Sequence, residues 1–301
     1  MLTARKTFPG GYAFLVAALV VLAAAPWLNT LAPSARIAIA LTAIAVVGLP
    51  HGAGDAWLAA RHGLLSRPAP AMLFLGGYVM LAGLVILIWL AAPVISLAVF
   101  LLVSAWHFGG DFARNEELVR RLSAGVALLG APALFWPDAV ASIYMALSGE
   151  AAEILVGWQS HLFVPACLVF FAVSLLPRPD SSTWRPIFEM GALILLAAAL
   201  TPLLWFTVYF AGLHSPRHFK GLFMQAGPGE RARLAGLSAL ATLASLVFGV
   251  CAAILLVSSG VEINDALVNV IFVGLAALTV PHMALVDGRL LDAPRAEGAS
   301  R

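Results

Sequence analysis

Long apolar segments recur along the whole chain and limit its fold more than any other feature. A helix needs about 20 mainly apolar residues to cross a bilayer, and runs of this length follow one another with only short polar stretches between them. Charged residues make up 11% of the chain, whereas an ordinary soluble domain carries roughly 25%. Because so few charges cannot cover a water-facing surface, we predict an all-α, polytopic integral membrane helical bundle.

We expect about 8–10 transmembrane helices in a single membrane-embedded domain that comprises residues 1–301. The segment 186–223 is too long for one span, and Thr201-Pro202 near its middle predicts either a kink or a turn between two shorter spans. The other candidate spans are 11–32, 37–60, 71–91, 93–113, 121–137, 155–176, 234–257 and 264–287.

The distribution of positive charge predicts the orientation of these spans, since Lys and Arg favour cytoplasmic loops. Arg5 and Lys6 place the N-terminus in the cytoplasm, and we interpret the first apolar run as an uncleaved span rather than a signal peptide. If 186–223 is divided into two spans, every larger basic cluster lies on the cytoplasmic side of the membrane. An eight-span version stays open if one or two short segments are re-entrant. The inner clusters are Arg61 and Arg67; Arg114, Arg120 and Arg121; Arg178 and Arg185; Arg217, Lys220, Arg231 and Arg233; and Arg289, Arg295 and Arg301.

Charge and cysteine content exclude several classes of protein. The net charge is +2 and no basic patch is visible, so nucleic acid binding is not indicated. Cys167 and Cys251 are the two cysteines of the chain, too few for a disulfide framework or a cysteine-based metal site. We expect each to be a small core residue.

Five of the seven histidines lie inside or at the end of apolar segments. Ionisable residues at membrane depth are costly and are functional candidates by default, although a single one is as readily a neutral imidazole bonded between helices. In the ten-span topology, four of them lie in the inner half of spans that run inward, so a cluster is feasible. We expect His62 and His161 to be structural or solvated. The five are His51, His107, His214, His218 and His282.

Two of these histidines belong to a repeated motif. His51-Gly-Ala-Gly-Asp55 and His107-Phe-Gly-Gly-Asp111 both place a carboxylate four residues after the imidazole. Metal-bound histidines usually donate their second ring N–H to a carboxylate, so both aspartates suit this supporting role, on the same helix or through another one. Asp111 could instead be an interfacial residue ahead of Arg114.

The third motif, His214-Ser-Pro-Arg-His218, places two imidazoles at a spacing that can hold one metal ion. Pro216 is expected to kink or break the helix there by freeing the carbonyl of Gly212. We interpret Arg217 as an anchor at the membrane boundary. Histidine ligands without cysteine suit iron, copper, zinc or nickel, and haem ligation is a competing reading. Nearby aromatic residues either line an apolar tunnel or pack the core: Trp57, Trp106, Phe108, Tyr209, Phe210, Phe219 and Phe223.

On these motifs the sequence resembles the Brp/Blh family of bacterial and archaeal membrane β-carotene 15,15′-dioxygenases. The resemblance rests on Pro50-His51-Gly52-Ala53, Trp106-His107-Phe108-Gly109, the segment His214 to His218, and Pro281-His282. It implies cleavage of the central double bond of β-carotene by O2 to two molecules of all-trans-retinal, in the cell membrane.

The resemblance also implies Fe(2+) held by His51, His107, His214 and His218, with Asp55, Asp111 and His282 in supporting positions. Retinal implies a microbial opsin as the recipient of the product. Two rivals are a haem- or metal-handling transporter, which predicts polar groups continuing through the outer half of the bundle, and a di-iron desaturase or hydroxylase, which needs many more histidines.

Overall fold

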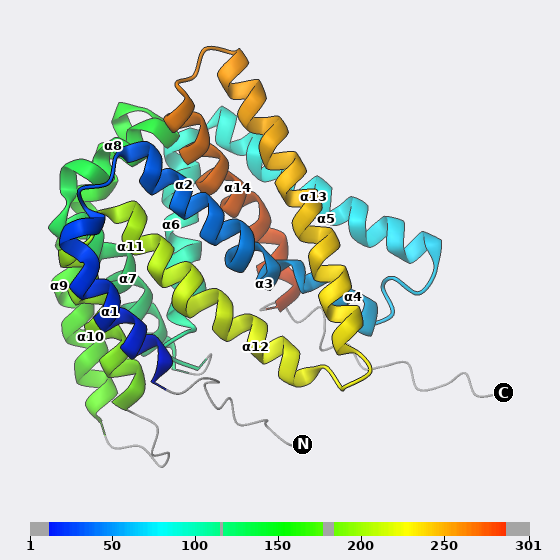
Figure 1. Ribbon diagram of the computed structural model, residues 1–301, viewed down its shortest axis with the longest axis horizontal. Helices are drawn as coiled ribbons and strands as arrows, with labels where there is room; N and C mark the ends of the chain where they lie inside the picture. The colour runs from blue at the N-terminus through cyan, green and yellow to red at the C-terminus, as the bar shows by residue number, and fades with distance from the viewer. Residues whose placement is uncertain (1–11, 115–116, 177–183, 287–301) are drawn as a thin grey trace.

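The computed structural model describes residues 12–114, 117–176 and 184–286, apart from the side chain of His51, and these residues form a bundle of helices (Figure 1). The described part of the chain contains helices and turns but no strand, so the all-α prediction is confirmed. The helices are α1 (Ala13–Leu28), α2 (Pro33–Ala43), η1 (Ile44–Gly48), α3 (Leu49–Ala53), α4 (Asp55–Arg61), α5 (Pro68–Ala91), α6 (Pro93–Gly109), α7 (Leu118–Phe135), α8 (Pro137–Ser148), η2 (Glu150–Glu153), α9 (Ile154–Leu175), α10 (Trp184–Ala199), α11 (Pro202–Tyr209), η3 (Phe210–His214), α12 (Ser215–Gln225), α13 (Arg231–Ser258) and α14 (Ile263–Val286).

Proline marks many of the helix starts and confirms the division at Thr201-Pro202. The helix α10 ends at Ala199 and α11 begins at Pro202, because proline lacks the N–H that a helix interior needs but fits the first turn. Among the described residues, five helices are long and apolar enough to cross a membrane: α5, α7, α9 with η2, α13 and α14. The short helix α8 was not predicted and occupies the expected outer loop. Ten crossings in total stay a prediction.

The closest helix packing joins α6 to α7. A side chain at Gly125 would place its Cβ 1.7 Å from the carbonyl oxygen of Ala105, and one at Gly109 would place it 2.0 Å from that of Arg121. Small residues let helix backbones approach closely, which is the main source of helix association in lipid. This contact fixes the end of α6 that carries His107.

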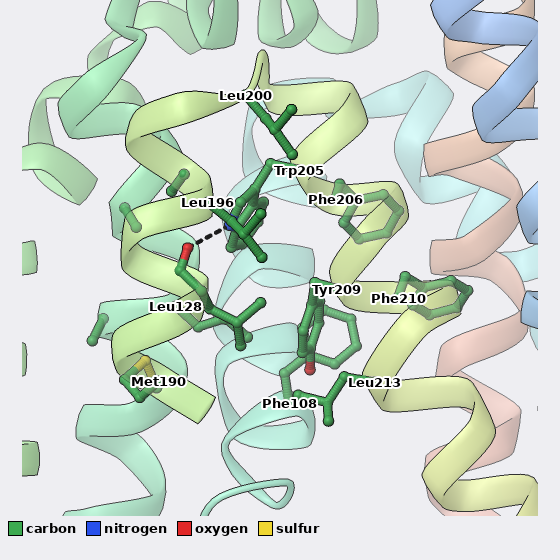
Figure 2. Packing of buried hydrophobic residues seen from close by; sticks show 14 of the residues in the cluster. Phe108, Leu128, Met190, Leu196, Leu200, Trp205, Phe206, Tyr209, Phe210 and Leu213 are labelled. Carbon is green, nitrogen blue, oxygen red and sulfur yellow. Dashed lines mark hydrogen bonds between the residues drawn. The ribbon is translucent and has the colours of Figure 1, made fainter. Parts of the chain in front are cut away.

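A buried apolar cluster fills the space between α1, α6, α7, α9, α10 and α11 (Figure 2). Trp205 lies in its middle, 2% exposed, and donates its indole N–H to the carbonyl of Leu193 at 2.9 Å. That bond satisfies the polar end of an otherwise buried ring. The cluster includes Phe108, Tyr209 and Phe210, so it lies directly beside the histidine region.

The helices α5 and α13 form the opposite, least buried side of the bundle (Figure 1). Within their apolar windows no residue is buried, and Leu73 and Leu90 are 80% and 76% exposed. Large exposed leucines on apolar helices are typical of a surface that contacts lipid. Cys251 is exposed on α13, so its predicted core position is wrong, whereas Cys167 is half-buried.

Several arginines predicted for inner loops gather at one end of the bundle. Arg121 donates to the carbonyl of Trp106 at 2.8 Å, and Arg120 donates to Ser174 at 3.0 Å, near the ends of α6 and α9. These contacts confirm that the basic residues around α6, α7 and α9 share one end, while the side of the membrane stays a prediction. Arg5, Lys6, Arg178, Arg289, Arg295 and Arg301 lie outside the described residues.

Candidate active site

Four histidines from distant parts of the chain meet at one depth in the bundle. The ring centroid of His107 lies 5.0 Å from that of His214 and 5.5 Å from that of His282. The ring of His218 lies 5.2 Å from His282 and 6.5 Å from His214. The clustering predicted from the shared depth of these spans is therefore confirmed for His107, His214 and His282.

Widened helical turns bring two of the motifs to this depth. The π-helical turn η3 ends at His214, immediately before Ser215-Pro216, and the π-helical turn η1 ends immediately before Leu49-Pro50. A π turn removes the regular backbone bond that proline would otherwise break. The expected disturbance by Pro216 is confirmed, in the form of a widened turn.

The two widened turns pack against each other. A Cβ added at Gly48 would lie 2.8 Å from the ring of Phe210. Glycine at this position therefore permits the approach of the two proline–histidine segments. Since η1 leads directly into α3, the contact also places the backbone of the His51 motif beside the histidines of η3 and α12.

Asp111 connects three elements around His214. Its carboxylate oxygen Oδ2 lies 2.9 Å from Nδ1 of His214 and accepts a hydrogen bond of 2.8 Å from the hydroxyl of Tyr209. Its backbone carbonyl accepts a bond of 2.7 Å from Arg217. The interfacial reading of Asp111 is wrong, since this residue is buried at the histidine cluster, with 8% of its surface exposed.

Asp55 makes a matching arrangement with His282. Its carboxylate oxygens lie 2.8 and 3.0 Å from Nδ1 of His282, and Tyr78 donates its hydroxyl to Oδ2 at 3.0 Å. Each aspartate thus serves a histidine of another helix. The reason is local: α3 gives way to α4 at Gly54 and α6 ends at Gly109, so neither helix continues unbroken from its histidine to its aspartate.

These contacts assign the protons of two rings. A carboxylate accepts at Nδ1 of His214 and of His282, so in the neutral form of each ring Nδ1 carries the proton and Nε2 carries the lone pair. Both rings are 3% exposed. An imidazole held in this tautomer by a carboxylate is the usual form of a metal-binding histidine.

The spacing of the rings fits one shared metal ion. Two imidazoles on one ion place their ring centres about 4.5–6.5 Å apart, because metal–nitrogen bonds are roughly 2 Å long. The four observed separations lie in this interval. In the part of the chain that the structure describes, no three His, Cys, Asp or Glu side chains are arranged so that they could hold a metal ion. His51, whose side chain lies outside the described residues, sits on α3, which packs against α12 and α14.

An apolar cavity of about 150 Å³ opens beside the histidines. His107, His214 and His282 lie along its wall, together with Phe108 and Phe210. Of the seven aromatic residues considered for a tunnel, these two phenylalanines are the ones found in the described wall. The remaining wall comes from η1, α3, α4, α5, α13 and α14.

The two exposed apolar helices, α5 and α13, both contribute to the wall of the cavity. Leu75 of α5 lines the cavity and is 51% exposed on the outer surface. Ala241 and Ser245 of α13 line it from the other side and are half-buried. The cavity therefore reaches the side of the bundle that carries the exposed apolar residues.

A buried ion-pair network lies next to the histidine cluster and is joined to it through Arg217. Arg217 donates to the carboxylate of Glu189 at 2.7 Å, and Arg185 donates to the same oxygen at 2.9 Å. Arg217 is 9% exposed and Glu189 is 1% exposed. The prediction of Arg217 as a boundary anchor is wrong, because its charge is neutralised inside the bundle by Glu189.

The remaining histidines lie apart, as predicted. His62 and His161 direct Nδ1 to carbonyls of their own helical segments, Leu58 at 2.8 Å and Gly157 at 2.6 Å. Sequence reasoning missed the hydrogen-bonding roles of Tyr78 and Tyr209. Their hydroxyl groups within apolar segments were the available signal, since a buried hydroxyl needs a partner.

Comparison with known proteins bears on the same region. The sequence profile described as β-carotene 15,15′-dioxygenase matches residues 42–289, which include all of the histidine motifs. A protein named β-carotene 15,15′-dioxygenase from uncultured marine bacterium 66A03 is 30% identical over 259 residues, covering 82% of this chain and 92% of that protein. No solved structure matches the chain. The chain therefore belongs to the β-carotene 15,15′-dioxygenase family.

Proposed function

We propose that the protein cleaves the central 15,15′ double bond of β-carotene with O2 and Fe(2+), releasing two molecules of all-trans-retinal. The observation that carries this proposal is a cluster of four imidazoles, three of which, His107, His214 and His282, line an apolar cavity bounded by the exposed helices α5 and α13. A site for a water-soluble substrate has no reason to lie there. An apolar lining also favours a lipid-soluble substrate over the ion path that a transporter requires.

The proposed iron ligands combine the family motif with the observed geometry. His51, His107, His214 and His218 come from the motif, and His282 joins them because its ring has the same carboxylate support as that of His214. Iron bound there would supply binding and activation of O2. Asp55 and Asp111 hold two of the rings in the tautomer and orientation that leave Nε2 as the ligand atom.

The cavity supplies binding, orientation and exclusion of water. Phe108 and Phe210 present ring faces and edges against which a flat polyene can lie. β-Carotene would enter between α5 and α13 directly from the bilayer, so the substrate need not pass through water. An apolar, closed environment also protects reactive oxygen species from side reactions with water.

The finer cellular assignments follow from charge and product chemistry. We place the protein in the cytoplasmic membrane with its N-terminus in the cytoplasm, on the distribution of basic residues. Retinal is sparingly soluble in water, so we expect it to pass to a membrane protein that binds it, such as a microbial opsin.

The direct test is expression in a bacterium that accumulates β-carotene, followed by chromatography of the extracted pigments. We expect loss of β-carotene and appearance of retinal. His107→Ala should abolish cleavage and lower the bound iron per protein, because this ring contacts both His214 and His282. His161→Ala is the matched control, since this exposed ring bonds to its own helix, and it should cleave as the wild type does.

Two outcomes would contradict the proposal. Unchanged pigment from correctly inserted, iron-loaded wild-type protein would show that carotenoid cleavage is not its activity. Full activity of His107→Ala would remove the histidine cluster from the reaction even if cleavage occurs.

A further inference from the structure

A second, smaller cavity lies away from α5 and α13. It measures about 80 Å³ and is lined by residues of α6, α7, α8, α11 and α14. Its wall is apolar and rich in aromatic rings, including Phe100, Trp205, Phe206 and Phe272. Protein interiors pack with few voids of this kind, so a cavity here is a feature that needs an explanation.

Phe108 connects this cavity with the one at the histidines. Among the described lining residues it is the member common to both. Its ring centroid lies 4.9 Å from that of His214 and 5.2 Å from that of Tyr209, and Figure 2 shows it beside Tyr209 at the lower end of the core. Phe108 therefore stands between the histidine cluster and the second cavity.

Helix geometry gives the direction from one cavity to the other. Ser104 and Leu101, which line the second cavity, precede Phe108 on α6 by about one and two turns of roughly 5.4 Å each. On the neighbouring segment, Phe206 of the second cavity stacks on Phe210 of the first at 5.3 Å. The second cavity thus continues from the histidines toward the N-terminal ends of α6 and α11.

The wall of the second cavity contains one buried hydroxyl group, that of Ser104, which lacks a hydrogen-bond partner in the described part of the chain. Ser104 is 2% exposed, and its hydroxyl has no hydrogen-bond partner among the described residues. A buried hydroxyl is normally satisfied.

We propose that the second cavity receives the distal arm of a long carotenoid and that Phe108 is the gate through which this arm passes. The inference rests on the proposed function, because the bond to be cleaved lies at the centre of a symmetric molecule. A substrate centred on the histidines must extend equally to both sides. The lipid-facing cavity accommodates one arm, and the second cavity is the space available to the other once Phe108 and its neighbours move.

The test fills the second cavity from two different helices. Leu101→Trp on α6 and Val140→Phe on α8 both add volume to its wall. Leu102→Trp is the matched control, because Leu102 is adjacent on α6 but is 70% exposed on the lipid-facing side. The substrates are β-carotene and a shortened apocarotenal that keeps one ring-bearing arm and the 15,15′ bond but has the other arm truncated just beyond it.

Two readouts separate binding from catalysis. We expect both filling variants to lose at least tenfold in cleavage of β-carotene and at least tenfold in the β-carotene retained by protein purified without oxygen. Cleavage of the shortened substrate should stay within about twofold of wild type. Leu102→Trp should match wild type in all three measurements.

The possible results each decide the question. Wild-type cleavage and retention of β-carotene by both filling variants would overturn the proposal. Equal loss of both substrates by both variants would overturn it as well, because the cavity would then support the fold rather than one arm of the substrate. If the wild type cleaves neither substrate, the proposed function fails, yet a tenfold fall in β-carotene retention specific to the filling variants would still support the cavity assignment.

Discussion

Asp111→Asn tests whether the carboxylates set the state of the histidine cluster. The substitution keeps the shape of the side chain and an oxygen acceptor but removes its charge. In the structure one oxygen of Asp111 faces both Nδ1 of His214, at 2.9 Å, and the hydroxyl of Tyr209, at 2.8 Å. The amide can keep these two bonds, so we expect the protein to fold, but the ring of His214 loses its charged partner.

The expected magnitude follows from the role of such a partner. Loss of a residue that supports a metal-bound histidine typically lowers metal affinity by about 10- to 100-fold, which corresponds to about 1.4–2.7 kcal/mol of binding free energy. Asp111→Ala should behave differently. It leaves two buried donors without an acceptor, at about 1–3 kcal/mol each, so we expect it to lower the unfolding free energy as well.

The assay is titration of bound iron against a chelator of known affinity, with thermal unfolding in detergent as the check on folding. Asp138→Asn is the matched control, because Asp138 lies exposed at the start of α8, and it should bind iron as the wild type does. If Asp111→Asn binds iron with wild-type affinity, the assignment of this carboxylate as support for a metal ligand is refuted. Asp55→Asn should show a similar loss, through His282.

Three further predictions concern the bundle itself. Gly125→Ala should lower the thermal midpoint by forcing α6 from α7, since its Cβ would lie 1.7 Å from a backbone oxygen, whereas Gly76→Ala on open α5 surface should leave it unchanged. Glu189→Gln should destabilise the protein by about 3 kcal/mol in equilibrium unfolding, because it leaves the buried charge of Arg217 uncompensated; an unchanged unfolding free energy would refute this. A reporter fused after Arg301 should be cytoplasmic, and an external reporter would overturn the ten-span topology.

Part of the candidate site was open to prediction from sequence. The spacing of charges and apolar runs predicted a shared depth for His107, His214 and His282, because each has a definite place within its expected span. Depth alone suggested that they could meet. The sequence also indicated that an aspartate would support a histidine, but the two-way choice between same-helix and cross-helix pairing stayed open.

The pairing itself was decided by tertiary packing. Asp55 supports His282, which is 227 positions away, and Asp111 supports His214, which is 103 positions away. The hydrophobic periodicity of one segment does not show which other helix will pack against it. The prediction for Arg217 was wrong for the same reason. A charge near the end of an apolar run is interpreted as a boundary residue, and its partner Glu189 on another helix cannot be identified from sequence.

By itself the sequence determined the all-α membrane class, the division at Thr201-Pro202 and the depth of the histidines. These properties depend on local chemistry, because lipid requires each segment to satisfy its own backbone hydrogen bonds and proline acts on its own helix. The tertiary structure alone decided the crossed aspartate–histidine pairs, the cavity wall shared by α5 and α13, and the second cavity beside Phe108. Those features depend on which helix faces are packed together, and with lipid as apolar as the side chains, close packing and buried polar bonds choose the partners rather than hydrophobicity.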